Sequence, residues 1–180
     1  MTPPAFRAVA LGMVHGRFQP FHNGHLEYVL DAFGRCGELL IGITNPEPEP
    51  VPAEPASPHR HLAAANPFRF VERSAMIRAA LADAKVDLQR VAIVPFPVHD
   101  PELWNRYVPA GTTHFIRVFS EWEAEKARRL RAAGFMVVEL PAPPAKEISG
   151  TEVRRRLAEG GDWRELVPRA VAELISGRNP

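Results

Sequence analysis

Two histidines flank a glycine near the start of the chain, in the stretch GRFQPFHNGH at residues 16–25. An imidazole can donate a hydrogen bond to a phosphate oxygen, and two imidazoles together can stabilise the charge that grows on a phosphate under attack. His22 and His25 are three residues apart around a turn, so both can project toward one ligand. Arg17 adds a planar cation suited to further phosphates. The stretch therefore predicts a site for phosphate chemistry.

The same stretch contains glycines that let the backbone come close to a ligand. Gly16 follows an apolar run, and Gly24 lies where a helix is expected to begin. A helix N-terminus offers N–H groups and a positive dipole end, which suit a phosphate. A zinc site is the weaker interpretation, because no third ligand follows at a suitable spacing. Neither the GxGxxG nor the GxxxxGK(S/T) pattern occurs, so imidazoles take the place of a phosphate-loop lysine.

A second candidate motif, ISGTEVR, lies near the other end of the chain at residues 148–154. Ser149 is a plausible N-cap, Thr151 falls in the first turn, and Arg154 follows one turn in. Alone, this pattern is typical of any capped helix. Together with the histidine pair it predicts a second phosphate clamp that faces the first across the sheet edge.

Apolar runs alternate with amphipathic segments along the chain. Strands are expected at residues 8–14, 38–44, 91–94, 113–119 and 135–140, and helices at 24–33, 71–82, 122–133, after Ser149 and at 167–175. Such alternation favours parallel strands joined by right-handed crossovers. We therefore expect an α/β, Rossmann-like three-layer fold with a five-stranded parallel sheet and C-terminal helices, as a single domain over residues 1–180.

Residues 45–67 break this alternation with the run NPEPEPVPAEPASPHRHLAAANP. The run is too long for an ordinary connection, and its prolines favour extended chain. It leaves the carboxyl end of the second strand, where open α/β sheets bind ligands. A surface loop and a lid are both open interpretations of residues 47–56, and a lid is favoured for residues 57–61.

The net charge, the cysteine count and the apolar runs of the chain argue against several classes of protein function. The formal net charge is +1, so the chain lacks the general basic field of a non-specific nucleic-acid binder. The single cysteine, Cys36, excludes an intramolecular disulfide and a multi-cysteine metal site. The N-terminus lacks a signal-peptide pattern, and no apolar run reaches membrane-spanning length. We expect a cytoplasmic protein without a nucleic-acid or membrane partner.

GRFQPFHNGH and ISGTEVRRRL together resemble the HxGH and ISxTxxR motifs of the nucleotidylyltransferase superfamily. The similarity runs over almost the whole chain and is nearest to the archaeal-type nicotinamide mononucleotide adenylyltransferases. It includes NPF followed by ER within residues 66–73, the Leu103-Trp104 pair and the ending GDWRELVPRAVAELI. The resemblance implies that an acceptor phosphate attacks the α-phosphorus of a nucleoside triphosphate in line and that pyrophosphate leaves.

The resemblance also implies roles for the matching residues. His22 and His25 would contact the triphosphate, and Arg17 and Arg154 would hold its β- and γ-phosphates. Further nucleotide or phosphate contacts are expected from Gly16, Phe18, Gln19, Gly24, Phe119, Ser149 and Thr151. Mg²⁺ is the implied cofactor, held by phosphates and water and by no protein side chain. Archaeal-type relatives are often hexameric, so a homo-oligomer is compatible with the resemblance.

Three loops depart from the adenylyltransferase pattern. After the second strand, TNP and the insertion replace a Gly-Ser-Ala-Gln type segment. After the fourth strand, FSEWE at residues 119–123 replaces a Gly-Asn type turn. The polar run before Leu103-Trp104 is changed to PVHDP. Intact triphosphate motifs beside changed loops indicate the same reaction on other substrates. The loops are more similar to those of cytidylyltransferases of phosphonate metabolism, which transfer CMP from CTP to a small phosphonate such as phosphonoformate.

This second similarity implies CTP and a small anionic acceptor as partners. The candidate acceptor contacts are Asn45, His59, Arg60, His61, Trp104 and Arg117. The charged candidates could also be solvated surface residues. Trp104 has two open interpretations: an aromatic that stacks on a nicotinamide ring, as in the adenylyltransferases, or a core anchor for a short helix.

Alternative functions remain at this point. An adenylyltransferase would use ATP and nicotinamide mononucleotide. A non-catalytic nucleotide sensor predicts the loss of a triphosphate contact, and none of His22, His25 and Arg154 is missing. A class I aminoacyl-tRNA synthetase relative is remote, because the chain is too short for an anticodon-binding region and lacks a KMSKS-type loop.

Overall fold

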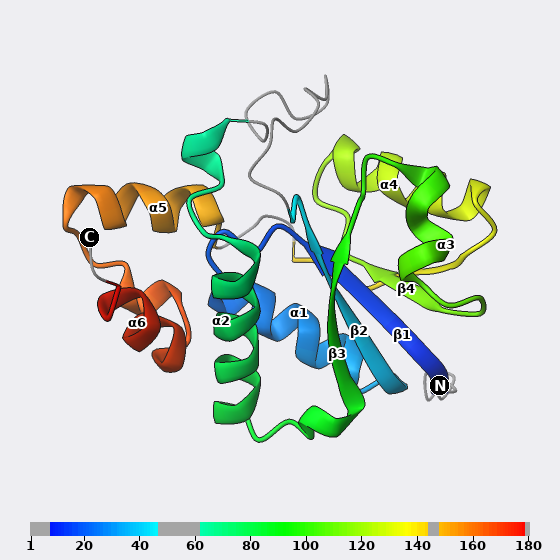
Figure 1. The fold of residues 1–180 in the computed structure, drawn as a ribbon, viewed down its shortest axis with the longest axis horizontal. Helices are drawn as coiled ribbons and strands as arrows, with labels where there is room; N and C mark the ends of the chain where they lie inside the picture. Colours follow the sequence, from blue (N-terminus) through cyan, green and yellow to red (C-terminus); the bar gives the residue numbers. More distant parts are fainter. Residues whose placement is uncertain (1–7, 47–61, 144–147, 179–180) are drawn as a thin grey trace.

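The computed structural model describes residues 8–46, 62–143 and 148–178. Five strands form one sheet in the order β3-β2-β1-β4-β5, and every pair of neighbours is parallel (Figure 1). The strands are β1 (Val9–Gly16), β2 (Cys36–Thr44), β3 (Val91–Phe96), β4 (Thr113–Ile116) and β5 (Met136–Glu139). The expected five-stranded parallel sheet of a Rossmann-like α/β fold is therefore confirmed.

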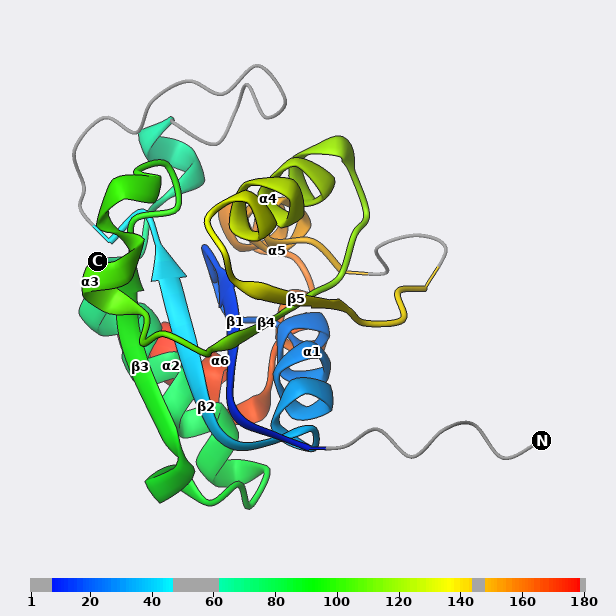
Figure 2. The ribbon, with the colours of Figure 1, turned by 90° about the vertical axis from the view of Figure 1, so that its right-hand side faces the viewer.

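Helices cover both faces of this sheet (Figure 2). They are α1 (Asn23–Phe33), α2 (Phe70–Asp83), α3 (Trp104–Tyr107), α4 (Glu121–Ala132), α5 (Gly150–Glu159) and α6 (Arg169–Ser176). Helices α1, α2 and α6 share one buried cluster with Val14 of β1, whereas α3 and α4 share another with Met13. Successive strand residues point to opposite faces, so one strand supplies both cores. None of the helices in the three described segments is long and apolar enough to cross a membrane.

The strand order explains where a ligand can bind. From β1 the chain runs outward through β2 to β3, then crosses to the other side of β1 and forms β4 and β5. The connections that leave β1 and β4 therefore run to opposite sides of the sheet. The point where the strand order reverses lies between these two strands, which pair through Gly12–Thr113 and Met13–His114. A crevice outside the carboxyl ends of two such strands is the usual ligand site of open α/β sheets.

Strand ends differ from the expected ones for backbone reasons. Strand β4 stops at Ile116, three residues before the expected end, where Leu140 donates the last bond to its carbonyl at 2.8 Å. Strand β3 instead continues through Pro95, which is tolerated because β3 is an edge strand. Strand β1 extends past residue 14 and keeps His15 in the sheet.

Only the two ends of the proline-rich insertion, residues 45–46 and 62–67, are described. Ala63–Ala65 form one short 3₁₀ turn, η1, where extended chain is expected. Residues 47–61 lie outside the described residues, and the predicted lid at 57–61 lies with them.

Candidate active site

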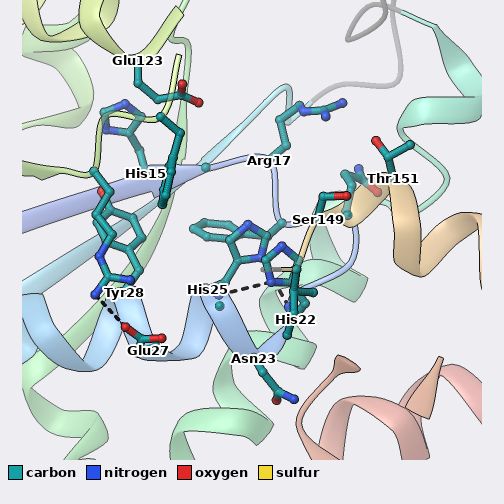
Figure 3. A pocket seen from close by; sticks show the side chains of 18 of the residues that line it. His15, Arg17, His22, Asn23, His25, Glu27, Tyr28, Glu123, Ser149 and Thr151 are labelled. Carbon is teal, nitrogen blue, oxygen red and sulfur yellow. Dashed lines mark hydrogen bonds and ion pairs between the residues drawn. The ribbon is translucent and has the colours of Figure 1, made fainter. Parts of the chain in front are cut away.

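A cavity of about 720 Å³ opens at the carboxyl ends of β1 and β4 (Figure 3). Its wall comes from the β1–α1 loop, the end of β4, the start of α4 and the start of α5. The predicted site residues that line it are Gly16, Arg17, Phe18, Gln19, His22, Gly24, His25, Arg117, Phe119, Ser149, Thr151 and Arg154. The fold thus brings the two sequence motifs from opposite ends of the chain to one cavity.

The two histidines of the first motif hold each other in place. His22 is the N-cap of α1: its Nδ1 accepts a bond from the His25 backbone N–H, and the His25 Nδ1 accepts one from the His22 N–H, both at 3.3 Å. The rings stack with centroids 3.5 Å apart (Figure 3). A ring nitrogen that accepts a hydrogen bond carries no proton, so these bonds assign the neutral tautomer with hydrogen on Nε2 to both rings. Each imidazole therefore presents Nε2–H as its donor.

The loop before this pair is fixed by Phe18 and Gln19. Phe18 has a positive φ of 52° and lies edge-on to His25, with ring centroids 4.9 Å apart. The Gln19 amide donates to the Phe68 carbonyl at 2.8 Å and accepts from the Phe68 N–H at 2.9 Å. Gln19 lines the cavity, but its side chain binds both backbone groups of Phe68, so it holds the loop in place. Both ends of the Gln19 side-chain amide are thus engaged within the protein, and its expected phosphate contact stays a prediction.

The second motif binds directly to the first. Arg154 donates to the Gln19 carbonyl at 2.6 Å and to the Thr151 hydroxyl at 3.2 Å, and burial lowers its pKa. A Cβ on Gly150 would lie 2.8 Å from the same Gln19 carbonyl, so only glycine permits this approach. Ser149 accepts from the Glu152 N–H at 3.2 Å, which confirms it as the N-cap of α5. Two helix N-termini and two arginines therefore surround one cavity, an arrangement that suits a polyphosphate.

Arg73 of α2 is a site residue to which sequence reasoning gave no role. It is 1% exposed, and its guanidinium donates to the carbonyls of Arg17, Thr44 and Asn45 at 2.9, 2.8 and 2.7 Å. Burial lowers its pKa to about 10. Since these carbonyls end β1 and β2, Arg73 fixes the backbone that carries Arg17. The Glu72-Arg73 pair can be found in the sequence, but the carbonyls that Arg73 binds cannot.

Replacing Arg73 with lysine is expected to lower the free energy of unfolding by about 1–3 kcal/mol, because an ammonium cannot donate in a fork to three separate carbonyls. The Arg17 backbone would also be released, so the KM for the nucleotide should rise. Chemical denaturation and steady-state kinetics measure the two effects. Arg69→Lys is the matched control on the exposed N-terminus of the same helix, and equal effects of both variants would contradict the role of Arg73.

Several predicted acceptor contacts lie away from the cavity. Trp104 is 1% exposed, donates from Nε1 to the Pro97 carbonyl at 2.8 Å and stacks on Phe96. It is the core anchor of α3, because its whole indole is enclosed on the α3–α4 face, and this corrects the stacking interpretation. Asn45 is also buried, with its carbonyl bound by Arg73. His59, Arg60 and His61 lie outside the described residues.

Arg117 does line the cavity, but carboxylates surround it. Its guanidinium pairs with Glu27 at 3.0 Å and Asp31 at 3.4 Å, and it lies 5.8 Å from the Tyr28 ring centroid. These two carboxylates offset its charge toward a ligand. Arg117 is therefore a weaker anion site than the arginines of the two motifs.

A divalent ion has no cage of side chains in the described part of the chain. No group of three His, Cys, Asp or Glu side chains there lies close enough to hold a metal. The donors that do line the phosphate region are imidazoles and arginines, which suit phosphate oxygens.

Similarity to a known protein family identifies the reaction class of this chain. A family described as cytidylyltransferase-like matches residues 13–156, a span that holds both motifs and every strand from β2 to β5. The chain belongs to the cytidylyltransferase-like family. Its expected class, a nucleotidyltransferase, is confirmed.

Two curated relatives of this cytidylyltransferase-like chain show the range of substrates. The phosphonoformate cytidylyltransferase of Streptomyces viridochromogenes is 43% identical over 164 residues, which is 91% of this chain and 89% of that protein. The nicotinamide-nucleotide adenylyltransferase of Thermococcus kodakarensis is 34% identical over 168 residues, which is 93% of this chain and 82% of that protein. Both similarities expected from the sequence are thus confirmed, and the similarity to the cytidylyltransferase is the stronger.

Solved structures support the fold of the cytidylyltransferase-like chain. A bifunctional NMN adenylyltransferase/ADP ribose pyrophosphatase from Francisella tularensis matches 93% of this chain with a TM-score of 0.72 and 19% identity. The chain spans about half the length of that enzyme, 49% of it. A second structure of the same enzyme, in complex with AMP and a Mn ion, has a TM-score of 0.69.

Proposed function

We propose that this protein is a CTP-dependent cytidylyltransferase that transfers CMP to a small phosphonate of the phosphonoformate type. The observation that carries the proposal is the 43% identity to a phosphonoformate cytidylyltransferase over 91% of the chain. The joined motifs support it, since Arg154 binds the loop that carries His22 and His25.

In the proposed reaction an oxygen of the acceptor phosphonate attacks the α-phosphorus of CTP. A new P–O–P bond forms to CMP, the bond to the β-phosphate breaks, and pyrophosphate leaves. Catalysis consists of positioning and charge stabilisation, without a covalent enzyme intermediate. The Nε2–H groups of His22 and His25 stabilise charge at the α-phosphate, and Arg17 and Arg154 hold the departing β- and γ-phosphates.

Mg²⁺ is the proposed cofactor. The phosphate oxygens and water would hold it, and it would neutralise charge on the pyrophosphate that leaves. Arg17 and Arg154, which line the cavity, would hold the same phosphates from the protein side. We further propose that the reaction is a cytoplasmic step of phosphonate biosynthesis.

Nicotinamide mononucleotide adenylyltransferase is the second candidate function. The 34% identity to the Thermococcus kodakarensis enzyme favours it. The burial of Trp104 argues against it, because this indole is enclosed in the core and does not line the cavity.

Pyrophosphate release with each of four nucleoside triphosphates, measured against phosphonoformate and nicotinamide mononucleotide, separates the candidates. We expect turnover with CTP and phosphonoformate. Robust NAD formation from ATP would overturn the proposal in favour of the second candidate. Nucleotide binding without turnover on a broad panel of phosphonate and phosphate acceptors would instead indicate a sensor.

A further inference from the structure

His15 is a buried polar side chain that the reaction described above does not use. It lies at the end of β1, lines the cavity and is only 5% exposed. Neither of its ring nitrogens has a hydrogen-bond partner among the described residues. A buried polar group without a partner is destabilising, so its retention requires an explanation.

A second buried histidine shows that the position of His15 matters. His114 of β4 is fully buried, both of its ring nitrogens also lack partners in the part of the chain that the structure describes, and its ring centroid is 5.9 Å from that of His15. His114, however, does not line the cavity. A ligand in the cavity can therefore supply a partner to His15, whereas His114 is enclosed in the protein.

His15 acts as a neutral imidazole. Burial lowers its pKa well below the usual value, and the nearby charge of Lys126 lowers it further. A neutral imidazole has one N–H donor and one acceptor nitrogen. His15 can thus donate a single directed hydrogen bond to a ligand without attracting it by charge.

Residues of α4 and α1 complete this part of the wall. Glu123 and Lys126 are three residues apart on α4 and both line the cavity, as do Phe119 and Tyr28. Glu123 is 6% exposed, and its carboxylate accepts a bond from the Ser120 hydroxyl. Figure 3 shows His15, Tyr28 and Glu123 on one side of the pocket and Ser149 and Thr151 on the other. We name His15, Tyr28, Phe119, Glu123 and Lys126 the β4 side of the cavity.

Charge distinguishes the two sides. Arg17 and Arg154 lie on the phosphate side, and the two carboxylates among the described lining residues are Glu27 and Glu123. Near the β4 side, Arg117 is paired with Glu27, and Lys126 shares a helix face with Glu123. Arginines suit a polyphosphate, whereas balanced charge with aromatic walls suits a neutral heterocycle.

We propose that His15 and Glu123 recognise the base of the nucleotide and select a pyrimidine that carries an exocyclic amino group. The proposal rests on the proposed use of CTP. The cytosine amino group would donate to the Glu123 carboxylate, and the single N–H of His15 would donate to the acceptor N3. A carboxylate accepts several hydrogen bonds at once, so the bond from Ser120 is compatible with this contact.

The same pair rejects uracil. Uracil presents a carbonyl oxygen where cytosine presents the amino group, so two acceptors, O4 and the carboxylate, would face each other. A buried site built for one hydrogen-bond pattern leaves its groups unpaired with the other base. The β4 side therefore predicts discrimination between CTP and UTP.

The test compares kcat/KM for CTP and UTP, with phosphonoformate as acceptor, in the wild type and three variants. Glu123→Gln is expected to reduce the CTP/UTP preference roughly 10-fold or more, because an amide can donate to O4. His15→Leu is expected to raise the KM for CTP roughly 10-fold while the melting temperature holds or rises, because an unpartnered imidazole is replaced by an apolar group. His114→Leu is the matched control and should leave the CTP/UTP preference unchanged.

Two results would overturn the proposal. One is an equal loss of CTP and UTP turnover in both His15→Leu and Glu123→Gln. The other is a raised KM for phosphonoformate with an unchanged KM for CTP, which would place these residues at the acceptor.

Calorimetric titration with CTP and with UTP, without an acceptor, separates this proposal from the function itself. Tighter binding of CTP by the wild type, weakened by His15→Leu, supports the base subsite even where phosphonoformate is not turned over. Equal binding of CTP and UTP by the wild type contradicts the base subsite whatever the acceptor.

Discussion

Replacing His25 with alanine is expected to lower kcat/KM by about 100- to 1,000-fold, the effect of removing one donor to a developing phosphate charge. The free energy of unfolding should fall by only about 1 kcal/mol, because one half of the cap of α1 is lost while the core is unchanged. His25 lines the cavity and accepts the His22 N–H, so both effects follow from one side chain. Pyrophosphate release and chemical denaturation measure them separately.

Asp87→Ala is the matched control for the lost cap. Asp87 caps the short turn η2 (Leu88–Arg90), where its carboxylate accepts from the Gln89 N–H at 3.0 Å, and it does not line the cavity. This variant should lose similar stability and keep its activity. A collapse of the melting temperature in His25→Ala, with activity lost in proportion, would show that the histidine serves packing.

Replacing Gly150 with alanine is expected to lower kcat/KM by roughly 100-fold, the usual cost of moving a catalytic group by about 1 Å. The new Cβ would lie 2.8 Å from the Gln19 carbonyl, which is backbone and cannot rotate away. Helix α5 must then shift from the loop and lengthen the bond from Arg154 to the same carbonyl. Steady-state kinetics should show the loss mainly as a higher KM for the nucleotide with a lower kcat.

Gly161→Ala is the control for a new methyl group near the same helix. The nearest atom to its added Cβ would be 3.7 Å away, an ordinary contact. Activity should stay near that of the wild type. If Gly150→Ala is equally active, close contact between the two motifs is not required for catalysis.

The sheet and the two motifs could be predicted from the sequence because their patterns are local. The alternation of apolar runs with amphipathic helices fixes parallel strands. HxGH lies at a single strand–helix junction, so its spacing alone brings His22 and His25 to one helix end. The same holds for Ser149, which caps a helix that begins one residue later.

Features that depend on distant contacts could not be predicted. Gln19 pairs with Phe68 and Arg73 binds three strand-end carbonyls, and neither bond leaves a pattern in nearby residues. Trp104 had two interpretations because an indole suits a core as well as a stacking site. In the sequence, His15 is one of several residues next to an apolar run. Only the fold shows that it lines a cavity and that its ring nitrogens have no hydrogen-bond partner among the described residues.

The proline-rich insertion is tied to the phosphate loop at both of its ends. Arg73 binds the Asn45 carbonyl where the insertion begins, and Gln19 binds Phe68 directly after it ends. The free energy of closing a loop grows only slowly with its length, so residues between two fixed anchors can be exchanged or lengthened at little cost to the fold. In evolutionary terms, substitutions and length changes in the insertion are therefore expected to leave the phosphate-handling loop in place.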